Sequence, residues 1–137
     1  MSEKKIKEIT AKTKQLDENL PAELLKKMHY YGQLLELYGI KQAQTTEEWK
    51  KAEATRKTVL GHFKTYGAEL EGVDEPKTAV DKEAQAEVAA KDYRQREAEA
   101  EGMALHWKAR REALYEQIQI MKKIYEHHVN VNNHGGV

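Results

Sequence analysis

A heptad repeat is the feature that most constrains the fold of this chain. Two series of positions, each spaced by seven residues, keep one phase from Leu24 to Leu70, and most of their side chains are apolar or aromatic. Such a repeat is typical of a long helix that buries a narrow seam against another helix. The first series is Met28, Leu35, Gln42, Trp49, Arg56, Phe63 and Leu70, and the second is Leu24, Tyr31, Tyr38, Thr45, Ala52, Val59 and Tyr66.

Local signals within this segment favour a break near Gly39. The glycine resembles a helix stop, and Thr45–Glu48 resembles the capping box of a new helix. A broken helix would normally lose its register, and the heptad phase does not slip. We therefore expect one continuous helix that begins near Pro21 and ends at the breakers of Gly72–Pro76.

A second long helix is expected from about Ala79 to His128, with Thr78 as its N-cap. Its seam again follows a heptad spacing. Two long helices joined by a short loop near 71–78 predict an all-α, antiparallel coiled-coil-like hairpin. The seam of the second helix is Ala86, Tyr93, Ala100, Trp107, Leu114 and Met121.

The organisation predicted from these patterns has three parts. Residues 1–18 form an amphipathic N-terminal helix or arm, residues 19–128 form the helical hairpin, and residues 129–137 form a disordered tail. Hydrophobic residues make up only 39% of the chain, so a thick core is not expected. Chains of this kind usually complete their burial by oligomerising, and we expect a homo-oligomer.

Composition and motifs exclude several classes of protein. The chain has no cysteine, no apolar run long enough to cross a membrane and no signal-peptide core at its start, so we expect a soluble, cytoplasmic protein. It carries no phosphate-binding glycine loop, no nucleophile elbow and no metalloprotease motif, so we expect neither an enzyme nor a cofactor. We expect no specific metal site at His127, His128 and His134, because adjacent histidines point to different faces of a helix.

Charge is balanced overall but unevenly distributed. Lys and Arg total 23 and so do Asp and Glu. Residues 1–41 and 102–137 together carry an excess of four basic side chains, and residues 42–101 carry an excess of four acidic ones. In an antiparallel hairpin both termini lie at one end, so that end is expected to be basic.

A local basic cluster precedes the expected loop and is the candidate nucleic-acid-binding site. Lysine and arginine neutralise phosphates, and interleaved aromatic rings can stack on unpaired bases. The alternative is that these cations form an ordinary solvated helix face. The candidate residues are Lys50, Lys51, Arg56, Lys57, Lys64 and Tyr66.

Arg56 has two interpretations, because it occupies a seam position. A polar seam residue can set the register or the oligomer order of a coiled coil. Alternatively, its guanidinium extends out of the seam into solvent. The first interpretation would remove Arg56 from the binding site.

The layout resembles small phage recombination mediators of the UvsY type over about residues 21–128. The resemblance rests on the order and spacing of Arg56–Leu60, Tyr66–Gly67, Lys77–Asp81 and Trp107–Leu114, with Tyr93 between the last two. Gly61 and His62 depart from it, because stronger basic character is expected there.

This resemblance implies a non-enzymatic accessory protein of phage recombination or replication. Such mediators bind single-stranded DNA as ring-shaped oligomers and load a RecA-like recombinase onto strands coated with single-strand-binding protein. By position, their DNA contacts correspond to Arg56, Lys57 and Lys64, with Lys50 and Lys51 beside them. The rival hypothesis is a phage structural, scaffolding or coiled-coil adaptor protein that binds no nucleic acid. A phage-encoded inhibitor of a host protein is a third possibility.

Overall fold

The computed structural model describes the backbone of residues 2–67 and 78–135, and side chains as far as Val131. Four α-helices make up this part of the chain, and no strand occurs in it. The helices are α1 (Ser2–Lys14), α2 (Pro21–Tyr66), α3 (Ala79–Ala89) and α4 (Lys91–Gly135). The all-α fold expected from the heptad pattern is confirmed.

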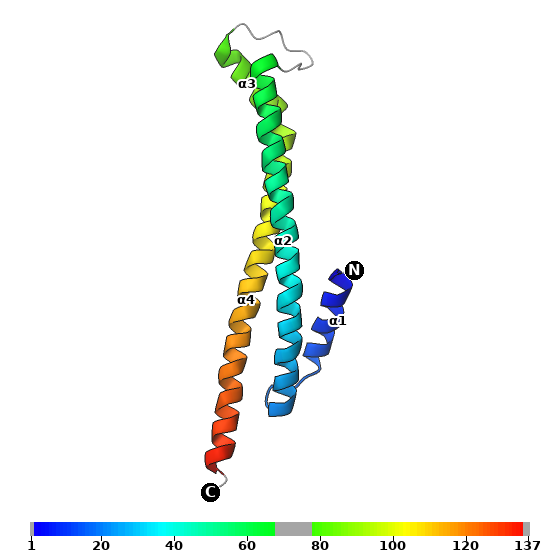
Figure 1. Cartoon of the computed structure of the whole chain (residues 1–137), viewed down its shortest axis with the longest axis vertical. Helices are drawn as coiled ribbons and strands as arrows, with labels where there is room; N and C mark the ends of the chain where they lie inside the picture. Colours follow the sequence, from blue (N-terminus) through cyan, green and yellow to red (C-terminus); the bar gives the residue numbers. More distant parts are fainter. Residues whose placement is uncertain (1, 68–77, 136–137) are drawn as a thin grey trace. The chain divides into compact units, whose positions relative to one another are not determined.

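The chain divides into two compact units that share the long helices. Unit 1 comprises residues 1–42 and 106–137, and unit 2 comprises residues 43–105. In unit 1, α1 lies alongside the first part of α2 (Figure 1). Within each unit α2 and α4 pack against one another.

Helix α2 is continuous over 46 residues, as the unbroken heptad phase predicts. Pro21 is its first residue, where the missing N–H costs nothing. The helix ends at Tyr66, because Gly67 adopts a φ of 86° and donates its N–H to the carbonyl of Phe63 at 2.8 Å. The expected end near Gly72 is therefore too late. The predicted loop at 71–78, apart from Thr78, and the seam residue Leu70 lie outside the described residues.

The second expected helix is divided in two. Thr78 caps α3 as predicted, with its side chain accepting the N–H of Asp81 at 3.1 Å. Ala90, with φ −85° and ψ 0°, is the C-cap at which α3 ends, and it donates its N–H to the carbonyl of Ala86 at 2.9 Å. Arg94 still donates its N–H to Ala90, so α4 begins without a loop.

Helix α4 extends beyond its expected end at His128 and reaches Gly135. The predicted disordered tail of 129–137 is therefore wrong for residues 129–135, and residues 136–137 are not described. Asparagine and histidine are weak helix formers, but no proline interrupts this segment. Extending an existing helix adds one hydrogen bond for each residue that becomes ordered, so residues of low helix propensity can also adopt the helical conformation.

The core of unit 1 draws on three helices. The expected N-terminal helix is present as α1, and it buries Ile6, Ile9 and Thr13 on one face. The seam residues Trp107 and Leu114 lie in this core as the repeat predicts, and Met121 of α4 is also buried. The buried cluster consists of Ile6, Ile9, Leu34, Tyr38, Trp107, Leu114 and Ile118.

The core of unit 2 is smaller. Leu60 of α2 packs on Ala86 and Ala90, and Phe63 lies half-buried against them. Small alanines let the leucine approach the opposite helix closely. Leu60, like Leu34 in unit 1, lies next to the predicted seam positions and not on them.

Candidate nucleic-acid interface

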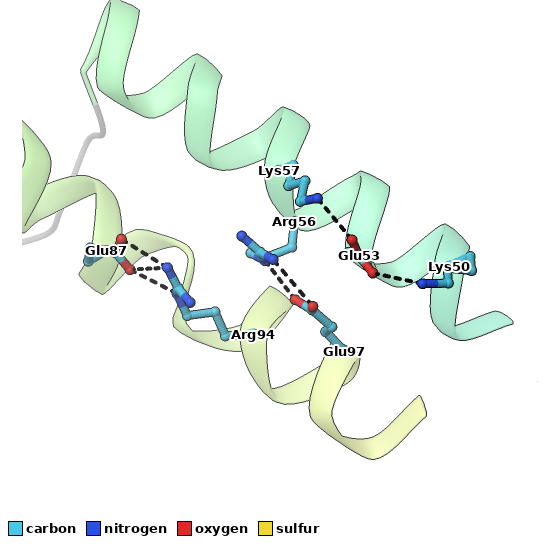
Figure 2. A network of polar contacts seen from close by, with 7 residues as sticks. All are labelled: Lys50, Glu53, Arg56, Lys57, Glu87, Arg94 and Glu97. Atoms are coloured by element: carbon cyan, nitrogen blue, oxygen red, sulfur yellow. Dashed lines mark hydrogen bonds and ion pairs between the residues drawn. The ribbon is translucent and has the colours of Figure 1, made fainter. Parts of the chain in front are cut away.

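The predicted binding residues all lie on the second half of α2, within unit 2. Their helical spacing places carboxylates of the same helix one turn away. Lys50 and Lys57 both contact Glu53, with N–O distances of 3.6 Å and 2.9 Å (Figure 2). Lys51 pairs with Glu47 at 3.1 Å.

Glu53 is held in its charged form by its two lysines. The hydrogen bond from Lys57 and then the charge of Lys57 lower the pKa of Glu53 most, and the charge of Lys50 adds to the effect. Lys50 also lies over the ring of Trp49, 4.5 Å from its centroid. These lysines remain exposed, and exposed pairs of this kind contribute little to stability.

Arg56 points away from solvent toward α4. Its Nε donates to Oε2 of Glu97 at 2.6 Å and its Nη2 donates to Oε1 at 3.3 Å (Figure 2). The two side chains are only 17% and 18% exposed. This two-bond pair between helices favours the register interpretation of Arg56.

The Arg56–Glu97 pair also shifts the pKa values of both side chains. The hydrogen bond from Arg56 lowers the pKa of Glu97, and the same bond raises the pKa of Arg56. Both groups are therefore charged over the whole neutral range. A phosphate could reach Arg56 only by displacing a carboxylate that is already well positioned.

The last turns of α2 present a different arrangement. The rings of His62 and Tyr66 are 4.9 Å apart, as expected for residues four apart on a helix. Tyr66 is 78% exposed, and Lys64 lies between the two in sequence, also exposed. Lys64 forms no ion pair with any residue in the described part of the chain. These residues, called the α2-end cluster below, are His62, Lys64 and Tyr66.

His62 belongs to this cluster but is not among the binding residues predicted from the sequence. The signal was present, because His62 and Tyr66 are separated by one helical turn. The resemblance implies stronger basic character at this position, whereas the structure pairs the ring of His62 with that of Tyr66.

The remaining seam residues of unit 2 are half-buried. Phe63 contacts the small core, and Tyr93 has Arg96 at 5.3 Å from its ring centroid. The indole Nε1 of Trp49 is buried and has no hydrogen-bond partner among the described residues. A buried donor without a partner is costly, so the indole of Trp49 is incompletely satisfied in this fold.

Among the described residues, no three His, Asp or Glu side chains gather closely enough to hold a metal ion. No helix in the same part of the chain is both long and apolar enough to cross a membrane.

Comparison with known proteins adds no constraint on the function. No protein family, curated protein or solved structure matches the chain.

Proposed function

We propose that this chain is a non-enzymatic accessory protein of phage DNA recombination or replication that binds single-stranded DNA as a homo-oligomer. The observation that supports it best is the α2-end cluster, where Tyr66 is 78% exposed and Lys64, on the same turn of α2, is exposed as well. An aromatic face that stacks on a base, next to a cation that meets a phosphate, is the usual unit of single-strand binding.

Three lysines in the preceding turns of α2 add to this surface. The pairs of Lys50, Lys51 and Lys57 with glutamates are solvent-exposed, so a phosphate can compete for each lysine at small cost. Arg56 is assigned to helix packing, because Glu97 already occupies its guanidinium. In this proposal Lys64 and Tyr66 dominate, and the three lysines add weaker contacts.

The zero net charge implies that one protomer binds weakly. Several protomers on one strand would supply the missing affinity, because each further contact is intramolecular once the first has formed. Following the resemblance to UvsY-type mediators, the partners proposed are a RecA-like recombinase and a single-strand-binding protein, in the cytoplasm of the host cell.

Fluorescence anisotropy with a labelled single-stranded oligonucleotide tests this proposal. We expect salt-sensitive binding that is tighter than binding to a duplex of equal length. The variant Lys64→Ala/Tyr66→Ala removes one phosphate contact and one stacking ring, so affinity should fall by about ten- to a hundredfold. Loss of the lysine should also reduce the slope of log affinity against log salt by about 0.7 for each protomer that binds.

A matched control removes the same groups from α4. The variant Tyr115→Ala/Lys123→Ala also deletes one exposed aromatic ring and one exposed lysine, but far from the α2-end cluster in sequence. Its affinity should stay near that of the wild type. Equal losses in both variants would contradict the assigned site, and no binding of the wild type at low salt would contradict the function.

A second candidate function is that of an assembly or coiled-coil adaptor protein without nucleic-acid binding. It is favoured by the pairing of four of the five basic residues with three glutamates. Under this hypothesis the wild type does not bind either oligonucleotide, and Arg56→Ala alters assembly.

A further inference from the structure

The two units carry opposite net charge. Unit 1 has thirteen basic and nine acidic residues, whereas unit 2 has ten basic and fourteen acidic residues. The whole chain is neutral, so this division is invisible in its net charge. Opposite charges on two compact units favour an approach of unit 1 of one copy to unit 2 of another.

Unit 1 contains a groove between α1 and α4 that suits an acidic helix. Its volume is about 470 Å³. Ile6 and Trp107 line it with apolar surface, and Lys7, Lys14 and Arg110 add three cations. Its one carboxylate, Glu3, lies 3.9 Å from Lys41 of α2 and is partly neutralised by it.

Unit 2 presents an exposed apolar stripe on α3. Val80 and Val88 are 74% and 62% exposed, and Ala84 lies exposed between them on the same face. The opposite face of α3 is used inside unit 2, where Ala86 is fully buried. Exposed valines at this spacing are expected to face another surface.

Acidic side chains flank this stripe. Glu83 and Glu87 lie one helical turn apart beside the valines, and both are exposed. Glu87 also pairs with Arg94 at 2.8 Å, and both side chains stay nearly half exposed (Figure 2). Helix α3 therefore combines an apolar strip with a carboxylate edge, which is the complement of the groove in unit 1.

The lengths of the two surfaces agree. Helix α3 has 11 residues and α1 has 13, which correspond to about 16 Å and 20 Å of helix. Lys7 and Lys14 are two turns apart along the edge of the groove. A helix of this length can thus lie beside α1 and α4 and meet both lysines.

We propose that α3 of one copy docks in the α1–α4 groove of a second copy. The valine stripe packs on Ile6 and Trp107, and Glu83 and Glu87 meet Lys7 and Lys14. The contact is heterologous, because each copy contributes a different surface, so repetition gives a ring or an open filament. This inference rests on the homo-oligomer of the proposed function but not on DNA binding.

A charge exchange between two variants tests this contact without DNA. The groove variant is Lys7→Glu/Lys14→Glu and the helix variant is Glu83→Lys/Glu87→Lys. Each alone places like charges across the contact, so self-association should weaken by at least about a hundredfold. All four side chains are exposed, so both variants should retain wild-type helicity by circular dichroism.

Mixing the two variants should restore the contact in both directions. The acidic groove of the first variant accepts the basic α3 of the second, and the unchanged basic groove of the second accepts the unchanged acidic α3 of the first. Analytical ultracentrifugation should therefore show monomers for each variant alone and, for the mixture, larger species that contain the two variants in equal amounts, as large as those of the wild type. Raised salt should weaken the wild-type assembly.

Two further variants serve as independent checks. Val80→Ser/Val88→Ser removes the apolar stripe without changing charge and should weaken assembly, and mixing it with the helix variant should not restore assembly. Lys122→Glu/Lys123→Glu makes the same charge change on exposed residues of α4 that do not line the groove, and should assemble like the wild type.

Distinct results overturn distinct statements. A wild type that stays monomeric at every concentration overturns this contact and the proposed homo-oligomer together. Assembly that survives in both charge variants, or a mixture that remains monomeric, overturns only this contact. Restored assembly in a protein that fails to bind DNA leaves this contact intact and overturns the proposed function.

Discussion

Units 1 and 2 use the same two long helices but bury very different side chains. In unit 1 the rings of Trp107 and Tyr38 pack edge to face, with ring centroids 5.5 Å apart. Arg110 lies within 5 Å of both ring centroids and donates a 2.8 Å hydrogen bond to the hydroxyl of Tyr38. In unit 2, one leucine meets two alanines, and Arg56 bonds Glu97 across the helices.

The difference indicates a division between stabilisation and interaction. Burial of a large apolar side chain contributes about 1.5–3 kcal/mol, whereas an alanine contributes much less. Unit 1 therefore has the larger hydrophobic contribution, and α1 adds to it. Unit 2 has polar groups and exposed valines at its surface. Both binding surfaces proposed for this unit, the α2-end cluster and the valine stripe of α3, lie there.

The largest expected effect is that of Trp107→Ala. Truncation of a buried tryptophan should lower the free energy of unfolding by about 3–5 kcal/mol, because a large cavity opens in the core of unit 1. Urea denaturation followed by circular dichroism measures the loss. Trp49→Ala is the control in unit 2. It should lower the free energy of unfolding by less than Trp107→Ala does, because Trp49 is half-buried and its Nε1 has no partner among the described residues. Equal losses would remove the distinction between the units.

Arg56→Ala should have an intermediate effect. It leaves Glu97 without its cation in a mostly buried position, so stability should fall by more than for Lys51→Ala, whose pair is exposed. The double variant Arg56→Met/Glu97→Leu should recover the loss, since apolar residues can replace a buried pair. Hydrogen exchange of unit 2 amides measures both changes. No recovery in the double variant would contradict a purely packing role for the pair.

Acid should weaken unit 2 through Glu97 and Glu53. The pKa values of both are lowered from the ordinary 4.5, so the folded state binds protons less readily than the unfolded state. Their contribution is present above the ordinary pKa and is lost as pH falls through the folded values. Exchange-protection measurements from neutral to acid pH should show this decline. The decline should be smaller in Arg56→Met/Glu97→Leu than in the wild type.

The smallest effect expected is a gain from Gly61→Ala. A Cβ at Gly61 meets nothing within 4 Å, so alanine should stabilise α2 by about 0.5–1 kcal/mol. Gly32→Ala, equally open but in unit 1, should give a similar gain. Gly67→Ala should instead reduce stability, because Gly67 has a positive φ. Thermal denaturation of the three variants checks both signs.

Local patterns accounted for much of the fold. The heptad phase predicted that α2 passes through Gly39 without a break, and Thr78 was recognised as a cap from its own side chain and the acids that follow. The end of α2 was harder to predict, since Gly67, Gly72 and Pro76 lie within ten residues. In the structure α2 ends before Gly67, which adopts a positive φ.

By itself the sequence determined the helices and their approximate seams, because helix formation depends on residues within a turn or two. Tertiary structure decided which cations are available. Arg56 and Glu97 are 41 residues apart, so no local charge pattern could reveal that they form a pair. The same holds for the groove between α1 and α4, because a groove exists only once distant helices pack. The candidate site could therefore be proposed from sequence, whereas the ion pairs and exposure of its residues became visible only in the fold.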